Sequence, residues 1–263
     1  MKRVQSTRRT GLARALSKLG YCSRSQAAKL IRAGRVRLNG GVRNDPETPV
    51  HMEQDRILVD ERVVGSRERI YLVMNKPRGV LTTASDEKSR ETVYSVLEKA
   101  GKALPWVAPV GRLDKASEGL LLLTNDSEWG AKVAAPETHL EKTYHVQIDK
   151  VVDGKFARML VNGVRTEDGF LRAAQARLLR SGEKNCWLAI TLEEGKNRQI
   201  RRMLAALEVE VLRLVRVAVG PLQLGELAKG AFRALTTEEK MSLDRAIRLR
   251  TSDLRPRTSG GTA

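Results

Sequence analysis

Residues 119–124 constrain the fold of this chain more than any other segment, because four consecutive leucines stand at their centre. Successive side chains of a strand point to opposite faces, so an unbroken apolar run requires cover on both faces. We therefore expect a buried strand here, in the interior of a sheet. The loop before it, residues 111–117, is then expected to sit on a rigid support.

Two charged side chains in this loop are the strongest candidates for a reactive site. Arg112 and Asp114 are two residues apart, which in extended backbone places both side chains on one face, while Leu113 points into the core. An aspartate is already ionised at neutral pH, because its ordinary pKa is about 3.9. Arg112 is therefore expected to keep the Asp114 carboxylate charged and oriented inside a water-poor pocket. The alternative is an arginine–aspartate pair that only braces a turn.

The balance of charge indicates a polyanionic partner. The sequence has 48 lysines and arginines against 31 acidic residues, a formal net charge of +17 and a pI near 10.3. Twelve of the cationic residues precede Asp45, the first acidic residue, and such a block repels itself unless phosphate neutralises it. Aromatic residues make up only 4%, which disfavours a base-stacking platform for single strands. Structured RNA held through its backbone fits better.

Metal, disulfide and membrane chemistry find little support in the sequence. The two cysteines, Cys22 and Cys186, lie far apart and the three histidines show no ligand spacing, so we expect free thiols and no bound metal. The amino-terminus lacks the apolar stretch of a signal peptide, and no apolar run approaches the roughly 20 residues that span a bilayer. We therefore expect a soluble, cytoplasmic protein that is a monomer by default.

The first sixty residues predict a small α/β RNA-binding module behind a basic arm. Residues 1–10 are predicted to be a disordered arm, and residues 11–62 contain helical spacing, a capping box of Ser23 with Gln26, and short strands around a turn at Asn39. Cationic side chains crowd the second helix and the following strand without interleaved acidic residues, which predicts a phosphate-binding surface. They are Arg24, Lys29, Arg32, Arg35 and Arg37.

A larger α+β domain is predicted over residues 70–250, joined to the module by a linker at residues 63–69. Its strands are expected near residues 70–74, 146–148, 186–192 and 209–217, and its helices near 93–99, 197–207 and 237–249. Because strands and long helices do not alternate regularly, a mixed or antiparallel sheet is favoured over a doubly wound parallel one. Residues 251–263 are rich in Ser, Thr, Gly and Pro and are predicted to be a disordered tail.

Three separated stretches carry recognisable patterns, namely GRLDKASEGLLLLTND at residues 111–126, EKTY at 141–144 and EGKNRQIRRM at 194–203. Together they resemble the motifs of the pseudouridine synthases that modify one or a few sites in ribosomal RNA. Residues 11–62 resemble the small RNA-binding module first described in a ribosomal small-subunit protein. The likeness covers roughly residues 11–249, and three motifs in the right order are far more specific than one short pattern.

The resemblance implies isomerisation of a chosen uridine of ribosomal RNA to pseudouridine. Breaking the ribose–uracil bond at nitrogen and rejoining it at carbon imports no group and oxidises nothing, so neither a cofactor nor a metal is expected. By resemblance, Asp114 is the essential catalytic residue, acting as a nucleophile or as a base. Tyr144 would stack on the target uracil and Arg201 would pair with the catalytic carboxylate. Arg112 completes the predicted catalytic set.

Other cations of these stretches have expected roles outside the chemistry. Arg198 and Arg202 flank Arg201 on the predicted helix at three- and four-residue spacing, and we expect them to contact RNA phosphates. Lys76 belongs to the stretch NKPRG at residues 75–79, which matches a further family motif loosely. It is interpreted as a structural or phosphate contact.

Two alternative functions stay open at this level. One is a catalytically silent RNA-binding or ribosome-assembly protein that kept the fold. The other is an enzyme that releases the base by hydrolysis, which normally needs two carboxylates about 5–5.5 Å apart. Glu118 is the only near neighbour of Asp114 in the motif, and nothing marks it as a partner. The joint presence of Arg112, Asp114, Tyr144 and Arg201 favours the isomerase.

Overall fold

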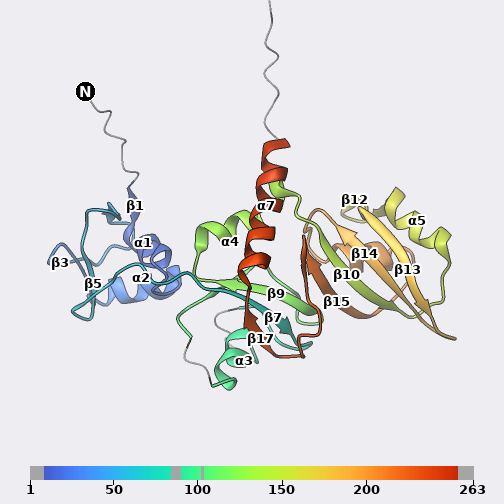
Figure 1. The fold of residues 1–263 in the computed structure, drawn as a ribbon, viewed down its shortest axis with the longest axis horizontal. Coiled ribbons are helices and arrows are strands. Elements are labelled where there is room, and N and C mark those ends of the chain that lie inside the picture. Colours follow the sequence, from blue (N-terminus) through green and yellow to red (C-terminus); the bar gives the residue numbers. More distant parts are fainter. Residues whose placement is uncertain (1–8, 84–89, 102–103, 254–263) are drawn as a thin grey trace, which may run out of the picture. The chain divides into compact units, whose positions relative to one another are not determined.

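Two units of chain make up the described residues, which are 9–83, 90–101 and 104–253 of the computed structural model (Figure 1). The first unit contains the described residues up to Tyr71 together with 104–108 and Leu123–Gly130, and the second contains the remainder. Most of the predicted arm (residues 1–8) and of the predicted tail (254–263) lies outside the described residues.

The first unit packs two short helices and several short strands around one apolar core. Ser23 caps the second helix: its hydroxyl accepts from the Gln26 N–H, and the Gln26 side chain accepts from the Ser23 N–H, which confirms the predicted capping box. Leu16, Ile31 and Val36 are fully buried in this core. Its helices are α1 (Leu12–Lys18) and α2 (Arg24–Arg32). Its strands are β1 (Thr10–Gly11), β2 (Val36–Leu38), β3 (Gly41–Val42), β4 (Pro49–Val50), β5 (Ile57–Val59) and β6 (Arg62–Val63). These strands form two sheets, with the orders β1-β4 and β3-β2-β5-β6.

A mixed sheet organises the rest of the chain and confirms the predicted α+β class. Its strand order is β13-β14-β10-β15-β9-β7-β17, with β16 paired to β15 and β8 to β9. Neighbours such as β10 and β14 are antiparallel, whereas β9 and β15 run parallel. The strands are β7 (Tyr71–Lys76), β8 (Ala108–Val110), β9 (Glu118–Thr124), β10 (Lys142–Ile148), β11 (Val164–Thr166), β12 (Gly169–Leu171), β13 (Gln175–Ser181), β14 (Cys186–Leu192), β15 (Val211–Val219), β16 (Leu222–Gln223) and β17 (Phe232–Ala234).

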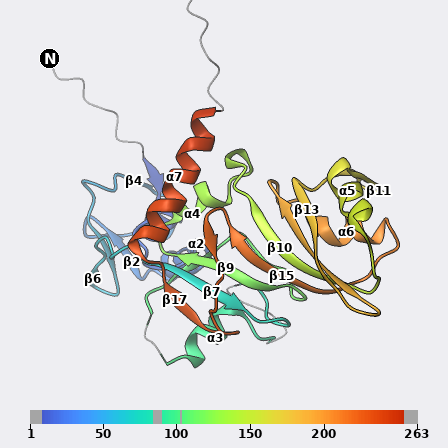
Figure 2. The same cartoon turned by 45° about the vertical axis from the view of Figure 1, so that its right-hand side comes forward.

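Helices cover this sheet at several places. The helices are α3 (Val93–Lys99), α4 (Ser127–Ala134), the short 3-10 helix η1 (Pro136–Thr138), α5 (Gly154–Asn162), α6 (Gln199–Ala205) and α7 (Thr237–Asp253). Figures 1 and 2 show α5 at the β13 edge of the sheet, where the two elements pack together. Helix α7 packs against β16 and η1. None of the helices in the described ranges is long and apolar enough to cross a bilayer.

The register of β10 assigns its side chains to two faces. Tyr144 lies opposite Ile190 of β14 and Arg216 of β15. Val146 belongs to the apolar core that also contains residues of α5 and α6, and Tyr144 packs against this core. His145 points to the opposite face of the sheet, because side chains alternate along a strand. Tyr144 of β10 and Arg216 of β15 therefore lie side by side on the face of the sheet that α6 covers.

Several predicted boundaries were displaced. Thr10 pairs with Val50 although it was placed in the disordered arm, and Val63, placed in the linker, ends β6. Helix α7 continues to Asp253, three residues into the predicted tail. In each case hydrogen bonding beyond the last patterned apolar residue extends the element, which periodicity alone does not report. The four strands and three helices predicted for the larger domain all have counterparts in the structure.

Candidate active site

The loop between β8 and β9 is fixed on a rigid support, as the leucine run predicted. All residues of β9 are buried, and Leu113 in the loop is 6% exposed. The Leu113 carbonyl accepts a hydrogen bond from the Thr82 hydroxyl at 2.8 Å. Leu113 thus anchors the loop in the core, and Arg112 and Asp114 on either side of it are exposed.

Lys76 holds the same loop from inside. Its side chain is fully buried, and Nζ donates to the carbonyls of Pro77 (3.0 Å), Asp114 (3.2 Å) and Ser117 (2.8 Å). Burial lowers the pKa of Lys76 to about 8, against the opposing attraction of Asp114 and Glu118. An ammonium group has three donors, which matches the three carbonyls. The structural interpretation of Lys76 is therefore confirmed, and a direct phosphate contact is ruled out by its burial.

Gly119 permits close contact between β9 and β15. Its φ is +101°, and a Cβ atom there would lie 2.2 Å from the carbonyl oxygen of Arg216. Only glycine fits such an approach. The result is that Arg216 of β15 is brought beside the segment that carries Asp114.

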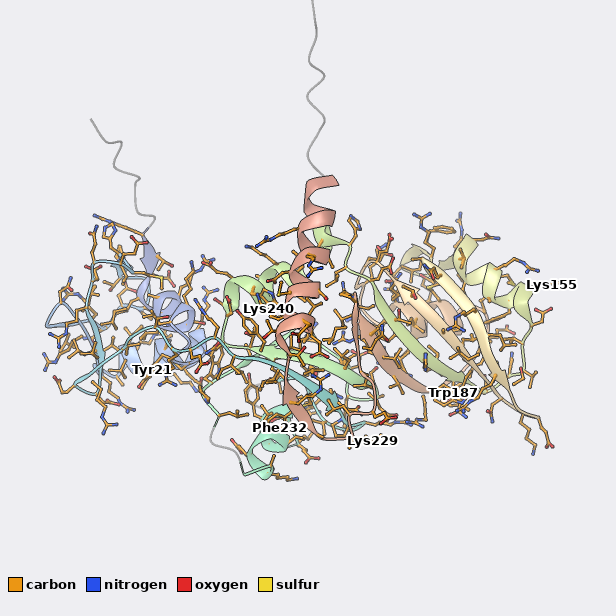
Figure 3. The ribbon with its side chains drawn as sticks, in the orientation of Figure 1. Tyr21, Lys155, Trp187, Lys229, Phe232 and Lys240 are labelled. Carbon is orange, nitrogen blue, oxygen red and sulfur yellow. The ribbon has the colours of Figure 1, made fainter. Side chains whose placement is uncertain are left out.

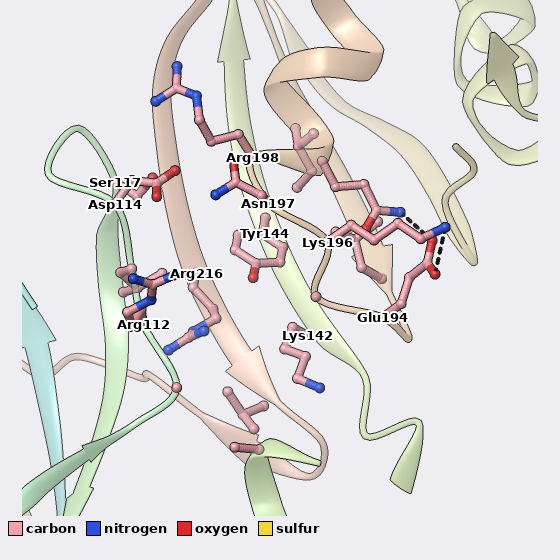
Figure 4. A pocket seen from close by; sticks show the side chains of 18 of the residues that line it. Arg112, Asp114, Ser117, Lys142, Tyr144, Glu194, Lys196, Asn197, Arg198 and Arg216 are labelled. Carbon is pink, nitrogen blue, oxygen red and sulfur yellow. Dashed lines mark hydrogen bonds and ion pairs between the residues drawn. The ribbon is translucent and has the colours of Figure 1, made fainter. Parts of the chain in front are cut away.

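A pocket of about 550 Å³ lies beside the contact between β9 and β15 (Figure 4). Ligand pockets in proteins generally enclose about 300–1,000 Å³. Its walls come from the loop before β9, from β10 and β15, and from the segment that leads into α6. The charged or polar side chains that line it are Arg112, Asp114, Ser117, Lys142, Tyr144, Glu194, Lys196, Asn197, Arg198, Gln199, Arg201 and Arg216. Cations outnumber carboxylates among them, so the pocket favours an anionic ligand.

Asp114 lines this pocket without an ion pair. Among the described residues, no lysine or arginine forms a salt bridge with its carboxylate, and Arg112 therefore does not brace it. Figure 4 shows Asp114 beside Ser117, with the Arg112 guanidinium directed elsewhere in the pocket. The predicted Arg112–Asp114 ion pair is therefore not formed among the described residues. Both side chains extend from a surface loop, and only Leu113 between them is buried.

Tyr144 is brought to the site by β10. It is half-buried, lines the pocket and packs against the apolar core through its ring. The bulge between Thr143 and Tyr144 shifts the pairing with β15 so that Tyr144 lies opposite Arg216. This position leaves room for a base beside the Tyr144 ring, and the stacking role of Tyr144 stays a prediction.

The Arg201 side chain contacts a backbone carbonyl of the loop that carries Asp114. Its Nη2 donates to the Ala116 carbonyl at 3.1 Å and its Nη1 to the Val211 carbonyl at 3.5 Å. Burial lowers the pKa of Arg201, as does the neighbouring Arg198, while the charge of Asp114 acts in the opposite direction. The predicted direct pairing with the Asp114 carboxylate is absent from the described contacts. Arg201 instead holds the loop two residues beyond Asp114.

The other two arginines of this segment have different surroundings. Arg198 caps the start of α6 with a left-handed φ of 47°, is exposed and lines the pocket. Arg202 does not line the pocket, and its Nη1 pairs with Asp168 at 2.8 Å. The spacing predicted a shared face, but the acidic partner comes from the β11–β12 turn, which a local pattern does not reveal. Of these two arginines, Arg198 alone lines the pocket and is placed to contact RNA there, as predicted.

Several lining residues were not assigned a role from the sequence. Lys142 and the segment 194–197 lie inside two of the quoted motifs, so their position was available but their chemistry was not. Glu194 is paired with Lys196 at 3.1 Å and accepts from Gln199 at 2.9 Å. Arg216 was missed altogether, although an arginine inside the otherwise apolar run at the end of β15 is itself a signal.

The cationic surface predicted for the first unit is only partly free. Arg35 forms two hydrogen bonds with Asp60, and Arg37 pairs with Glu61 at 2.8 Å. Asp60 and Glu61 form the tight turn between β5 and β6, which brings acidic groups that the local sequence did not show. Of the five cations predicted to bind phosphate, Arg24, Lys29 and Arg32 are exposed and form no ion pair with any described residue.

The thiols and acidic groups offer no metal site in the described ranges. No cluster of three or more His, Cys, Asp or Glu side chains there could hold a metal ion. Cys22 and Cys186 are free and buried, and burial raises the pKa of the Cys22 thiol to about 11.

Comparison with known proteins agrees with this geometry. Residues 70–206 match the RNA pseudouridylate synthase family, and residues 10–57 match the S4 domain. An uncharacterized RNA pseudouridine synthase of Aquifex aeolicus is 36% identical over 236 residues, covering 89% of this chain and 94% of the relative. The ribosomal large subunit pseudouridine synthase B of Bacillus subtilis is 35% identical over 230 residues, covering 87% and 93%. A crystal structure of a pseudouridylate synthase has a TM-score of 0.61 and 30% identity, covering 89% of this chain and 99% of that chain.

The mixed sheet, the pocket and the amino-terminal module define an RNA-modifying isomerase. The chain belongs to the RNA pseudouridylate synthase family and converts uridine to pseudouridine in RNA. The silent RNA-binding protein and the base-releasing hydrolase are therefore set aside. Glu118, the second carboxylate considered for hydrolysis, does not line the pocket.

Proposed function

We propose that this enzyme modifies a specific uridine of ribosomal RNA and that Asp114 is its essential catalytic residue. The observation that carries the assignment is a lone unpaired carboxylate in a nucleotide-sized pocket whose other charged groups are mainly cationic. Asp114 would act on the ribose or the base, as a nucleophile or as a base. The reaction imports no group and oxidises nothing, so it requires no cofactor.

The remaining predicted catalytic residues support Asp114 in different ways. Tyr144 would stack on the uracil after the nucleotide has flipped out of its helix or loop, which costs a few kcal/mol that the occupied pocket offsets. Arg201 would fix the loop through the Ala116 carbonyl, and Arg112 would contact the phosphate of the flipped nucleotide from its exposed position.

The choice of ribosomal RNA as substrate rests on two supports. A relative of similar length is named as a large-subunit ribosomal pseudouridine synthase, and the S4 domain supplies the unpaired cations Arg24, Lys29 and Arg32. Phosphate contacts through such cations fix an RNA duplex without reading its sequence. A cytoplasmic location with the ribosomes and action as a monomer belong to the same proposal.

The decisive experiment maps pseudouridines across total RNA from cells with and without the gene. We expect a site in ribosomal RNA to be lost and to return with the wild-type gene but not with Asp114→Asn. Restoration by the Asp114→Asn gene would refute the catalytic assignment, and loss of a site only in another RNA class would refute the substrate.

The docking role is tested by replacing the three free cations with alanine. Each phosphate contact contributes about 0.9 to the slope of log K against log salt for a duplex. Replacing Arg24, Lys29 and Arg32 together should therefore flatten this slope. The matched control replaces Arg35 and Arg37, which are already paired with Asp60 and Glu61. Equal effects of both sets would contradict a role specific to the unpaired cations.

A further inference from the structure

We propose that Arg216 binds the polar edge of the target uracil and stabilises the negative charge that the base carries while it is detached from the ribose. This inference rests on the proposed function of the Asp114 pocket. It assigns to the uracil-binding side of that pocket a cation which the quoted motifs do not contain.

The side chain of Arg216 is buried but incompletely bonded. Arg216 is 7% exposed, and its Nε donates to the Leu120 carbonyl at 2.7 Å. Within the described part of the chain, its two terminal nitrogens make no hydrogen bond and no carboxylate pairs with them. These nitrogens are not among the side-chain atoms that are buried without a partner, so they face the pocket and are available to a ligand with hydrogen-bond acceptors.

The position of Arg216 fits a uracil. It is the register partner of Tyr144 across β10 and β15, so the two side chains leave the sheet next to each other on the same face. Both line the pocket, and Figure 4 shows both projecting into it. A base stacked on the Tyr144 ring would present its oxygens sideways, toward the neighbouring strand that carries the guanidinium.

The Nε bond makes this guanidinium a fixed donor. Leu120 belongs to β9, which pairs with β15 at Gly119 and Arg216, and the close approach at Gly119 sets the distance between the two strands. The Leu120 carbonyl thereby orients the planar group and leaves its two terminal nitrogens for a ligand. Preorganised donors cost no rearrangement when charge develops on the substrate.

The reaction generates such charge on the base. When the C1′–N1 bond breaks, its electron pair leaves with the uracil ring and spreads over N1, O2 and O4. Asp114 either takes the vacated bond at C1′ or removes a neighbouring ribose proton and later returns it. The ring then turns and C5 forms the new bond to C1′, which displaces the Asp114 carboxylate where that group had bonded to C1′. The C5 proton is released and N1 gains a proton. Donors at O2 or O4 stabilise the base most while it is detached.

A phosphate of the RNA is the competing ligand for a cation in this pocket. A phosphate contact strengthens RNA binding and its salt dependence, whereas a contact with the detached base acts mainly on turnover. Measurements of binding and of turnover on the same variants therefore separate the two.

The experiment uses the full chain and transcripts of ribosomal RNA that contain C5-tritiated uridine, from which turnover releases tritium. Arg216→Met should lower kcat by about 10²–10³-fold, the usual loss when one preorganised donor is removed. RNA affinity, its salt slope and the thermal midpoint should stay close to those of the wild type. Arg216→Lys keeps a charge but not the planar donor geometry, and its kcat should lie between the two.

Chemical rescue supplies a readout that a merely structural role does not move. Guanidinium ion, well below denaturing concentrations, should restore part of the turnover of Arg216→Ala, while the same concentration of urea should not. Arg213→Met, on the same strand but paired with Glu118, is the matched control and should keep wild-type turnover.

Three outcomes overturn the inference. Unchanged kcat in Arg216→Met removes the role, a weaker and less salt-dependent RNA affinity assigns Arg216 to a phosphate, and a lowered thermal midpoint without rescue makes it structural. Absence of tritium release by the wild-type enzyme on any ribosomal transcript would instead count against the proposed substrate.

Discussion

The segment that runs from the loop at residues 111–117 into β9 carries two carboxylates with opposite surroundings. Glu118 at the start of β9 is 2% exposed, accepts two hydrogen bonds from Arg213 at 3.0 and 3.1 Å, and pairs with Lys229 at 2.8 Å. Figure 3 labels Lys229 on the second unit. Asp114, four residues earlier, is exposed, lines the pocket and has no ion pair among the described residues.

This difference separates a structural carboxylate from one available to a substrate. Burial alone would raise the pKa of Glu118, but Arg213 and Lys229 outweigh it and hold that pKa below its ordinary value. The protein thus completes the bonding of Glu118 by itself. For Asp114 it fixes only the backbone, through Lys76 and Arg201 on the neighbouring carbonyls, and leaves the carboxylate free.

The largest expected effect is on turnover, from Asp114→Asn. We expect a loss of at least about 10³-fold in tritium release from C5-tritiated uridine, because removing a nucleophile or base eliminates the reaction path. RNA affinity should hardly change, since one exposed carboxylate contributes little to a phosphate-binding surface. Glu118→Gln is the matched control and should retain turnover at temperatures where it stays folded. Loss of turnover in both variants alike would remove the distinction drawn between the two carboxylates.

The next effect is on stability, from Arg213→Met combined with Lys229→Met. The double variant leaves Glu118 buried and unpaired, which costs about 3–5 kcal/mol of unfolding free energy. Urea denaturation measures it. Each single variant should lose far less than half of that, because the remaining cation still pairs with the carboxylate. Additive single effects would show that Glu118 does not share its two partners.

A third effect tests how the loop is held, through Lys76→Met. The pKa of Lys76 is lowered from 10.5 to about 8, so between pH 8 and 10.5 the unfolded chain keeps a proton that the folded chain has lost. The linkage therefore favours the folded state increasingly across that window, by at most about 3 kcal/mol. The difference in unfolding free energy between wild type and Lys76→Met should rise accordingly in urea titrations. A flat difference would mean that folding does not lower the pKa of Lys76.

The smallest effect is the acid response of Glu118→Gln. A lowered pKa in the folded state means that ionised Glu118 contributes stability above its ordinary pKa of about 4.3. That contribution is lost as the pH falls through the depressed value. The wild type should therefore lose more stability than Glu118→Gln on acidification in this range. Urea denaturation of the two proteins across the acid range measures this difference, and equal losses would contradict the ionic pairing of Glu118 with Arg213 and Lys229.

Many helices and strands of the larger domain could be predicted from the sequence because their apolar patterns are local. The leucine run of β9, the helix at Val93–Lys99 and the strand at Cys186–Leu192 each carry their own apolar pattern. The capping box at Ser23 likewise depends on residues three apart. Asp114 was singled out by the family motif at residues 111–126, because its charge and spacing alone fitted equally an arginine–aspartate pair that only braces a turn.

The errors concern contacts between segments that are distant in the sequence. Arg35 and Arg202 were predicted to face RNA, yet their partners Asp60 and Asp168 lie 25 and 34 residues away. The Arg112–Asp114 pair was inferred from adjacency, but extended backbone on one face does not oblige two long side chains to meet. Ion pairs form wherever folding brings charges together, and sequence spacing does not determine that.

The sequence by itself determined the buried strand, the loop that Leu113 pins and the cationic character of the chain, because side-chain alternation and net charge are properties of the chain alone. Only the tertiary structure decided which charges are left without partners. Arg216 lies 102 residues after Asp114 in the sequence, and it reaches the pocket because Gly119 lets β15 approach β9. The packing of strands, which acts through space, therefore set the chemistry of the pocket.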